Sequence, residues 1–401
     1  MSDSIIPRLL AAPVKAMAQK YPVLTITGPR QSGKTILAKT VFPKMDYVLL
    51  ENPDERLLAN SDPRAFLNRY PKGVIIDEAQ RAPEIFSYIQ GIVDSRPRDG
   101  QFILTGSQHF LLSKHITQSL AGRVSIHHLL PFSYPEVSGL KQCPEIWDEL
   151  LFCGFYPRIW DKELPPEKWY GDYINTYLER DVRDLKNIGD LSVFQRFLRI
   201  SAGRHAQVIN LSSIADDCGV SSNTIKSWFS ILEASFLVYF IPPYYRNFNK
   251  RLIKAPKMFF YDSGLVCYLL GLTDAENVSF HPQKGSLAEG YVFSELVKYF
   301  YNRGREPKIY FWRDRTGHEV DALVEINGRL AAFEVKSAQT FNERFLDSIR
   351  YLRGFHKEMK GVVIYDGHLE FEKDGIRVAN WKNLPAVLDS LVIGQVRKKG
   401  S

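Results

Sequence analysis

The chain has 401 residues, of which 45% are hydrophobic and 24% are charged, and this composition is typical of a globular protein with two or three domains. It excludes a disordered chain, a collagen-like repeat and a small disulfide-stapled scaffold. The sequence contains no run of about 18 apolar residues, so it predicts no membrane-spanning helix. The net charge of +7 favours a polyanionic partner. Four cysteines without a CxxC pair, and an N-terminus without a signal-peptide pattern, predict a cytoplasmic protein.

Short β-rich runs alternate with amphipathic segments between residue 20 and about residue 135. The runs are VLTIT, YVLL, GVIID, QFILT and RVSIHHL. This alternation predicts βαβ units and a mostly parallel, buried sheet. Helical patterns follow from about 140 to 240, and mixed α/β patterns begin at about 285. We predict an α/β domain at 1–140, a helical segment that completes it at 141–205, a winged helix-turn-helix at 206–280 and a second α/β domain at 281–401.

Residues 28–35 read GPRQSGKT and match the phosphate-binding pattern GxxxxGK[ST] between a predicted strand and a predicted helix. Glycines allow backbone N–H groups to surround phosphates, Lys34 reaches the terminal phosphates, and the Thr35 hydroxyl binds Mg²⁺. The pattern therefore predicts ATP and Mg²⁺ as cofactors. The predicted nucleotide-binding residues are Gly28, Pro29, Arg30, Gln31, Ser32, Gly33, Lys34, Thr35 and Ser107.

The strand GVIID ends in two carboxylates. We assign Asp77 to the Mg²⁺ shell and Glu78 to orienting the attacking water, although a solvated strand end is the alternative. Ser107 or Thr105 could sense the γ-phosphate, and turn capping explains these residues almost as well. Arg123 is a candidate for stabilising transition-state charge, in this subunit or a neighbouring one; an ordinary surface arginine is the alternative. The arginine that completes the ATP site of a neighbour could be Arg123, Arg158 or Arg180.

The motifs GPRQSGKT, IIDEAQ, LTGSQ and LAGR resemble the AAA-type ATPase module of a large prokaryotic family with a restriction-endonuclease-like C-terminal domain. The segments Gly154-Phe-Tyr-Pro157 and Tyr177-Leu-Glu-Arg180-Asp181 also resemble that family, and the resemblance covers nearly the whole chain. It implies a P-loop ATPase of the ring-forming kind, and so a homo-oligomer for which a hexamer is one candidate. Gln108 and His109 depart from the family pattern, which has further serines after Ser107.

Residues 211–228 predict two helices joined at Gly219, with Ser221 or Ser222 capping the second helix. Strands at 236–240 and 257–261 would form a wing, and the segment between them interleaves basic and aromatic residues, which can bind phosphates and stack on bases. The predicted DNA contacts are Ser222, Asn223, Lys226, Arg246, Lys250, Arg251 and Lys254. A winged helix that serves only protein contacts is the alternative.

The dipeptide Asn327-Gly328 predicts a type I′ hairpin in which Ile326 pairs with Arg329. In this register Asp321 lies opposite Glu334 and Glu319 lies opposite Lys336. Directly opposed β-carbons are about 4.5–5.5 Å apart, so paired carboxylates there favour a divalent cation between them, either Mg²⁺ or Mn²⁺.

This hairpin resembles the PD-(D/E)xK nuclease core, with Asp321, Glu334 and Lys336 at the motif positions and Val320 where the motif has a proline. The resemblance implies that Glu289, from a preceding helix, adds a third carboxylate ligand. Lys336 would orient a water or stabilise charge on a scissile phosphate. The alternative is a Glu319–Lys336 ion pair in a domain that binds DNA without cutting it.

The sequence thus predicts an α/β protein with an AAA-type parallel sheet, a winged-helix middle and a nuclease-like C-terminal domain. We expect it to hydrolyse ATP and to couple this to remodelling of, or movement on, DNA such as forks or junctions. One alternative is an ATP-gated, Mg²⁺-dependent DNA nuclease in defence or repair; another is a nucleotide-dependent switch that recruits a protein. The predicted catalytic residues are Lys34, Asp77, Glu78, Arg123, Asp321, Glu334 and Lys336.

Overall fold

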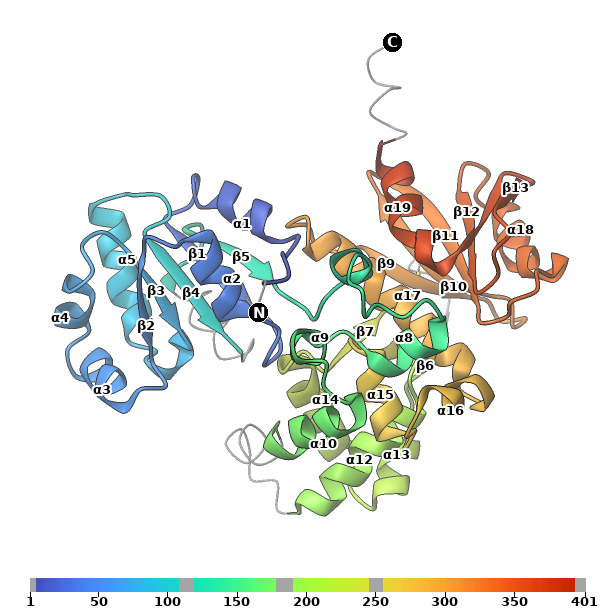
Figure 1. The fold of residues 1–401 in the computed structure, drawn as a ribbon, viewed down its shortest axis with the longest axis horizontal. Helices are drawn as coiled ribbons and strands as arrows, with labels where there is room; N and C mark the ends of the chain where they lie inside the picture. The colour runs from blue at the N-terminus through green and yellow to red at the C-terminus, as the bar shows by residue number, and fades with distance from the viewer. Residues whose placement is uncertain (1–4, 108–118, 178–189, 245–254, 394–401) are drawn as a thin grey trace, which may run out of the picture.

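The computed structural model describes residues 5–107, 119–177, 190–244 and 255–393. An N-terminal α/β unit lies at one side of the molecule, a helical region lies below the centre of the view, and a C-terminal α/β unit lies at the other side (Figure 1). In the described part, no helix is both long enough and apolar enough to cross a membrane.

The N-terminal unit is built on a parallel sheet whose strand order is β2-β3-β4-β1-β5. The strands are β1 (Val23–Thr27), β2 (Asp46–Leu49), β3 (Val74–Asp77), β4 (Phe102–Gly106) and β5 (Val124–His128). Each of the five β-rich runs in the sequence forms one of these strands. The prediction of a mostly parallel sheet is therefore confirmed.

Helices cover both faces of this sheet, which explains why β1, β3 and β4 are buried along their whole length. Helices α1 (Ala11–Met17) and α2 (Lys34–Val41) pack on one face. Helices α3 (Pro53–Ser61), α4 (Pro63–Asn68) and α5 (Ile85–Ser95) pack on the other. A short 3₁₀ turn, η1 (Ala79–Arg81), follows β3.

The middle of the chain is mainly helical, with a small antiparallel sheet of order β6-β8-β7. Its helices are α7 (Tyr134–Val137), α8 (Trp147–Cys153), α9 (Pro157–Lys162), α10 (Pro166–Tyr177), α12 (Leu191–Gly203), α13 (Leu211–Cys218), α14 (Ser222–Ala234), α15 (Ser263–Leu269) and α16 (Ala275–Phe280). Its strands are β6 (Gln207–Val208), β7 (Val238–Ile241) and β8 (Lys257–Phe260).

The two helices expected between residues 211 and 228 are present as α13 and α14. Gly219 ends α13 in the left-handed conformation at φ 72°, which a glycine adopts without a Cβ clash. The Ser221 hydroxyl accepts a hydrogen bond from the Thr224 amide and caps α14, so Ser221 rather than Ser222 is the cap.

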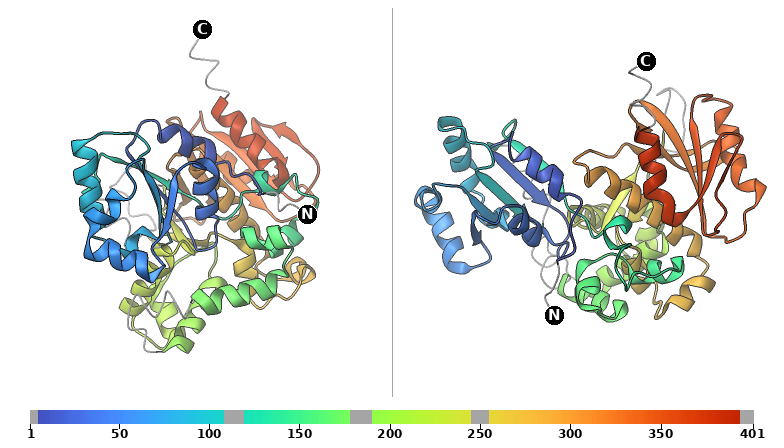
Figure 2. Two further views of the ribbon diagram at one scale, coloured as in Figure 1. Left: turned by 60° about the vertical axis from the view of Figure 1, so that its left-hand side comes forward. Right: turned by 45° about the horizontal axis from the view of Figure 1, so that its top comes forward.

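The C-terminal unit has a mixed sheet of order β13-β14-β12-β11-β10-β9. Its strands are β9 (Ile309–Arg313), β10 (Glu319–Ile326), β11 (Arg329–Lys336), β12 (Lys360–Tyr365), β13 (Phe371–Lys373) and β14 (Ile376–Asn380). Its helices are α17 (Lys284–Tyr301), α18 (Asp347–Arg353) and α19 (Leu384–Ile393), with the 3₁₀ turns η3 (Glu343–Leu346) and η4 (Trp381–Asn383). Helix α17 runs between the middle region and this sheet (Figure 2). One hydrophobic core extends over both.

The hairpin register is confirmed from Ile326–Arg329 to Ala322–Phe333. Asn327 and Gly328 both have positive φ, as a type I′ turn requires. The expected pairs Asp321–Glu334 and Glu319–Lys336 lie beyond the last pair of the β10–β11 ladder, Ala322–Phe333. On its other side β10 pairs with β9, where Glu319 lies opposite Arg313 and the register shifts between Val320 and Leu323. The ammonium of Lys336 instead lies 2.6 Å from Oε1 of Glu334, two residues away on its own strand.

Candidate functional site: a nucleotide cleft and a carboxylate cluster

The phosphate loop has the backbone that close wrapping of phosphates requires. Gly28 has φ 152°, and a Cβ added there would lie 2.1 Å from the carbonyl oxygen of Leu129, so only glycine fits. Gln31 and Gly33 also have positive φ, at 61° and 93°, and Gly33 immediately precedes α2. The loop therefore delivers backbone N–H groups to the N-terminus of α2, where the helix dipole favours an anion.

Lys34 and Thr35 begin α2 and point to different partners. The buried Lys34 ammonium donates hydrogen bonds to the carbonyl oxygens of Gly28, at 3.0 Å, and Pro29, at 2.7 Å. The Thr35 hydroxyl donates a 2.6 Å hydrogen bond to Oδ2 of Asp77. Lys34 thus lies against the phosphate loop, and Thr35 links that loop to the end of β3.

Asp77 is held from several sides. The Tyr47 hydroxyl donates to Oδ2 of Asp77 at 2.9 Å, and the buried Thr105 hydroxyl donates to Oδ1. Burial, followed by the charge of Asp77, raises the pKa of Tyr47 well above its usual range. The Thr35 hydroxyl and the Asp77 carboxylate together offer the all-oxygen donors that Mg²⁺ prefers, so these residues fit the predicted cation.

Glu78 stands next in the chain with an unusual backbone. Its φ of 56° places a non-glycine residue in the left-handed region, which is uncommon and is concentrated at functional sites. Its Oε2 accepts hydrogen bonds from the Ser107 hydroxyl at 3.1 Å and from the Gln80 amide at 2.5 Å. The structure therefore places Ser107 against the carboxylate predicted to orient water. Gln108 and His109 lie outside the described residues.

A cleft of about 760 Å³ lies between the phosphate loop and the helical region. One wall carries Lys34, Thr35, Asp77 and Glu78, and the opposite wall comes from α9 and α10. Arg158 of α9 is exposed in this cleft and makes no hydrogen bond or ion pair with other residues in the described ranges. The helical region thus presents a guanidinium to the place where phosphates would bind.

Arg123 does not line this cleft. It precedes β5, and because β1 and β5 are parallel it lies at the edge of the sheet opposite the phosphate loop. Its guanidinium forms a two-pronged ion pair with Asp94 at 2.5 and 2.9 Å. A role for Arg123 in the site of a neighbouring subunit stays a prediction. Arg180 and Asp181 lie outside the described residues.

Arg8 is a contact of the phosphate loop that no sequence motif indicated. Its guanidinium donates to the carbonyl oxygens of Ser32 at 2.6 Å and Leu130 at 2.7 Å, and to Oε1 of Glu136 at 3.0 Å. The other oxygen of Glu136 accepts hydrogen bonds from the amide and hydroxyl of Ser133. Arg8 therefore ties the loop to the segment that leads out of the N-terminal sheet.

The predicted DNA contacts are only partly described. Ser222, Asn223 and Lys226 are exposed on α14, as expected for an outward-facing second helix. The other four (Arg246, Lys250, Arg251 and Lys254) lie outside the described residues.

The residues predicted to form a nuclease-like site lie close together with a lysine that the sequence did not indicate. The Lys257 ammonium, from β8, lies 2.9 Å from Oε1 of Glu289 and 2.5 Å from Oε1 of Glu319. Oδ2 of Asp321 accepts a hydrogen bond from the Val335 amide at 2.8 Å. We call Glu289, Glu319, Asp321 and Glu334 the carboxylate cluster.

The electrostatics of the carboxylate cluster follow from its burial. Burial, together with the charge of Asp321, raises the pKa of both Glu289 and Glu334. Burial by itself would lower the pKa of Lys257, but Glu289, Glu319 and Asp321 outweigh it and raise that pKa. Lys257 is therefore a charged ammonium within the cluster.

The carboxylate cluster is not a preformed metal site. Oε2 of Glu334 is buried without a hydrogen-bond partner among the described residues, and such an oxygen would suit a cation. However, those residues contain no group of three or more histidine, cysteine, aspartate or glutamate side chains placed to hold a metal. Lys257 also engages Glu289, one of the three predicted ligands. The predicted Mg²⁺ or Mn²⁺ therefore does not fit the cluster in this arrangement.

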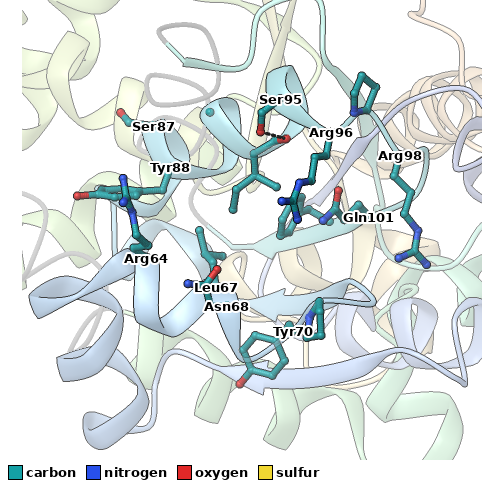
Figure 3. Close-up of a pocket in the computed structure, with 15 residues that line it drawn as sticks. Arg64, Leu67, Asn68, Tyr70, Ser87, Tyr88, Ser95, Arg96, Arg98 and Gln101 are labelled. Carbon is teal, nitrogen blue, oxygen red and sulfur yellow. Dashed lines mark hydrogen bonds between the residues drawn. The ribbon is translucent and has the colours of Figure 1, made fainter.

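A second cavity, of about 1030 Å³, lies on the N-terminal α/β unit away from the phosphate loop. Figure 3 shows Arg64, Arg96 and Arg98 around it, together with Tyr70 and Tyr88. Its lining includes Gln101 and Phe102, where β4 begins, whereas the phosphate loop follows the end of the parallel strand β1. The two cavities therefore lie at opposite edges of the sheet.

Three stretches of the chain match known families. Residues 20–138 match an AAA domain, residues 144–276 a domain of unknown function (DUF8612), and residues 284–384 another domain of unknown function (DUF4143). The phosphate loop, Asp77 and the parallel sheet lie within the first match. The fold and the site thus define an AAA-type P-loop ATPase with a DUF4143 domain at its C-terminal side.

The chain is 30% identical over 335 residues to the uncharacterized proteins Rv2008c of Mycobacterium tuberculosis and Mb2031c of Mycobacterium bovis, covering 82% of this chain and 74% of each relative. It belongs to the same family as these proteins. It is also 24% identical over 343 residues to the uncharacterized protein MJ1544 of Methanocaldococcus jannaschii, covering 78% of this chain and 73% of that protein.

Among solved structures, the chain is similar to the Walker-type ATPase PABY2304 of Pyrococcus abyssi, with 16% identity and a TM-score of 0.46 over 67% of this chain and 97% of that one. It is also similar to RuvB of Thermotoga maritima, with 17% identity and a TM-score of 0.29 over 58% of this chain and 87% of that one.

Proposed function

We propose that this ATPase binds DNA and couples ATP turnover to remodelling of, or movement on, DNA, as a ring-forming homo-oligomer. The observation that carries the ATPase part is the contact of Thr35 and Thr105 with the two oxygens of Asp77. Lys34 and the loop N–H groups bind the terminal phosphates, Thr35 and Asp77 hold Mg²⁺, and Glu78 orients the attacking water. Bound Mg²⁺ supplies charge neutralisation at the phosphates.

Two features support the DNA-binding part. The succession of α12, β6, α13, α14, β7 and β8, with β8 between β6 and β7, agrees with a winged helix. In such a domain α14 would be the recognition helix, and its exposed Ser222, Asn223 and Lys226 are of the types that contact phosphates and base edges. The chain's net charge of +7 suits a polyanion.

A continuous set of polar contacts supports the coupling. Arg8 joins the phosphate loop to Glu136, which holds Ser133. The Ser133 hydroxyl accepts from the Asn302 amide, one residue beyond α17, and the Tyr134 amide donates to Glu295 within α17. A change at the phosphate loop would therefore act on the long helix that packs against the C-terminal sheet.

The deciding experiment is steady-state ATP hydrolysis with Mg²⁺, alone and with duplex, forked and four-way-junction DNA. We expect one DNA structure to stimulate turnover, and Lys34→Ala to abolish it. Lys44→Ala is a matched control, because Lys44 is an exposed lysine just beyond the same helix and does not line the nucleotide cleft. Full activity of Lys34→Ala would refute the catalytic assignment.

Lys226→Ala tests the DNA part separately. Loss of one phosphate contact should weaken binding to every sequence and reduce the salt dependence of binding by about one unit of slope. A rate of ATP hydrolysis that none of the DNA structures changes would favour the nucleotide-dependent switch that recruits a protein. Metal-dependent cleavage that Asp321→Ala and Lys336→Ala abolish would favour the ATP-gated nuclease.

A further inference from the structure

The carboxylate cluster contains a cation that comes from another part of the chain. Lys257 belongs to the small three-stranded sheet of the middle region, whereas Glu289 lies on α17, and Glu319 and Asp321 lie on β10. Only 5% of the Lys257 side chain is exposed, and its ammonium contacts Glu289 and Glu319 together. A lysine buried in this way persists because the carboxylates compensate its lost hydration.

The position of Lys257 conflicts with a metal at the cluster. A Mg²⁺ or Mn²⁺ ion would need a Glu289 oxygen about 2.0–2.2 Å away, and the ammonium already lies 2.9 Å from Oε1 of that residue. Two cations sharing one carboxylate in a buried site repel each other strongly. Glu334 is held in the same way by Lys336, at 2.6 Å.

We propose that Lys257 is an internal competitor for a divalent cation at the carboxylate cluster. While β8 packs against the cluster, Lys257 takes the place of the metal ion at Glu289, and the C-terminal domain is held in a metal-free state. The contact thus joins the middle and C-terminal regions and excludes the cation for as long as it persists. This inference does not depend on ATP hydrolysis or DNA binding.

The test measures Mn²⁺ binding to the nucleotide-free full chain by the electron paramagnetic resonance signal of free Mn²⁺. Lys257→Met removes the charge and keeps most of the side-chain volume, so we expect Mn²⁺ affinity to rise at least tenfold over wild type. Asp321→Asn in the Lys257→Met background should remove this gain. Lys308→Met is the matched control, because Lys308 forms an exposed ion pair with Glu325 on the same sheet.

Equal Mn²⁺ affinity in wild type and Lys257→Met, or no binding by either, would overturn the proposal. Lys257→Arg retains the cation and should bind Mn²⁺ no better than wild type. If Lys257→Met does not fold, wild type and Glu319→Gln still test the proposal. Tight, Asp321-dependent Mn²⁺ binding by wild type, in which Lys257 is in place, would contradict the competition. No Mn²⁺ binding by wild type, together with Mn²⁺ binding by Glu319→Gln, in which Lys257 is held less firmly, would support it.

A different observation concerns the cavity lined by Arg64, Arg96 and Arg98. Their guanidinium groups make no hydrogen bond or ion pair with any residue that the structure describes, and no acidic side chain lines the cavity. Oε1 of Gln101, a residue that is only 9% exposed, is also without a hydrogen-bond partner there. Three uncompensated positive charges beside Tyr70 and Tyr88 form a surface that suits phosphates and stacked bases.

We infer that this cavity receives the backbone phosphates of a nucleic-acid strand, as a second DNA contact on the ATPase domain itself. The inference rests on the proposed DNA binding. Because the cavity and the phosphate loop lie at opposite edges of the sheet, its ligand is separate from ATP.

The test compares DNA affinity, by fluorescence anisotropy over a series of KCl concentrations, for wild type and the triple variant Arg64→Ala, Arg96→Ala and Arg98→Ala. We expect weaker binding and a salt slope smaller by about two to three units, with basal ATP hydrolysis retained. Arg305→Ala, at an exposed arginine outside the cavity, is the control. If the salt slope is unchanged in the triple variant but reduced in Lys226→Ala, the inference about the cavity is overturned and the proposed DNA binding stands. If wild type binds no DNA, both the inference and the proposed DNA binding are overturned.

Discussion

The Thr35 hydroxyl lies 2.6 Å from Oδ2 of Asp77, although β4 separates the strand that precedes the phosphate loop from the strand that ends in Asp77. The intervening strand supplies Thr105, whose hydroxyl holds the other oxygen of Asp77. Both carboxylate oxygens are therefore oriented by side chains of the protein itself. Preorganised groups of this kind lose little free energy to reorganisation during the reaction.

Thr105→Val should lower kcat for ATP hydrolysis about tenfold or more, because a hydrogen bond to a charged group contributes roughly 1.5–3 kcal/mol. The Mg²⁺ concentration needed for half-maximal rate should rise, since Asp77 loses one of the groups that orient it. Thr105→Ser restores the hydroxyl and is the matched control. Wild-type kinetics in Thr105→Val would show that Thr105 does not position Asp77.

Arg158→Ala should lower kcat by roughly 10²–10³, the range seen when one preorganised donor is removed from a developing charge. The reason is that Arg158 lies exposed in the nucleotide cleft, opposite the phosphate loop. Phosphate release at saturating ATP measures the effect. Lys168→Ala, on the neighbouring helix and paired with Asp172 in solvent, should leave kcat unchanged. Equal rates for the two variants would remove Arg158 from the catalytic site.

Lys257→Met should lower the free energy of unfolding by about 3–5 kcal/mol, because removing one partner of a buried ion pair leaves uncompensated carboxylates. The double variant Lys257→Met/Glu289→Gln should recover part of this loss. Urea unfolding of the C-terminal region measures both. Lys308→Met should leave the free energy of unfolding almost unchanged, since its ion pair is exposed. Equal losses for the two lysine variants would contradict a buried role for Lys257.

His205 should make the protein sensitive to acid. Burial lowers its pKa to about 3, and its Nδ1 accepts a hydrogen bond from the Phe260 amide. The unfolded chain binds a proton near pH 6.5, which the folded chain rejects, so stability should fall as pH decreases from about 6.5 towards 3. The slope contributed by this residue is about 1.4 kcal/mol per pH unit.

His205→Asn keeps an acceptor for the Phe260 amide but cannot titrate. We expect lower stability at neutral pH and a flatter decline in acid, measured by urea unfolding at several pH values. Burial also lowers the pKa of His127, to about 4, so His127 contributes to the loss of stability in acid in both wild type and His205→Asn. His318→Asn, at an exposed histidine, is the control. An unchanged acid slope in His205→Asn would show that His205 does not carry this dependence.

Local patterns were enough to predict much of the fold. The alternating runs predicted all five strands of the N-terminal sheet, and the Asn327-Gly328 turn predicted the hairpin register, because side-chain periodicity and turn conformation depend on neighbouring residues. The expected pairs Asp321–Glu334 and Glu319–Lys336 lie farther from the turn, beyond the end of this ladder at Ala322–Phe333. In that part of β10 the register against β9 shifts between Val320 and Leu323, which no residue in the hairpin indicates.

Some residues of the candidate site could likewise be predicted from local sequence patterns, and others could not. Lys34, Thr35 and Asp77 stand in short motifs whose spacing is tied to strand ends and to a helix N-terminus, so the amino-acid sequence alone was sufficient to place them in one chemical site. The tertiary structure was needed for Arg8 at the phosphate loop and for Lys257 among the carboxylates, and it placed Arg158, one of three arginines that the sequence left open, across the nucleotide cleft. These residues are distant along the chain from the groups they face. Packing of separate elements brings them there, and a buried charge then persists only where such a partner compensates its lost hydration.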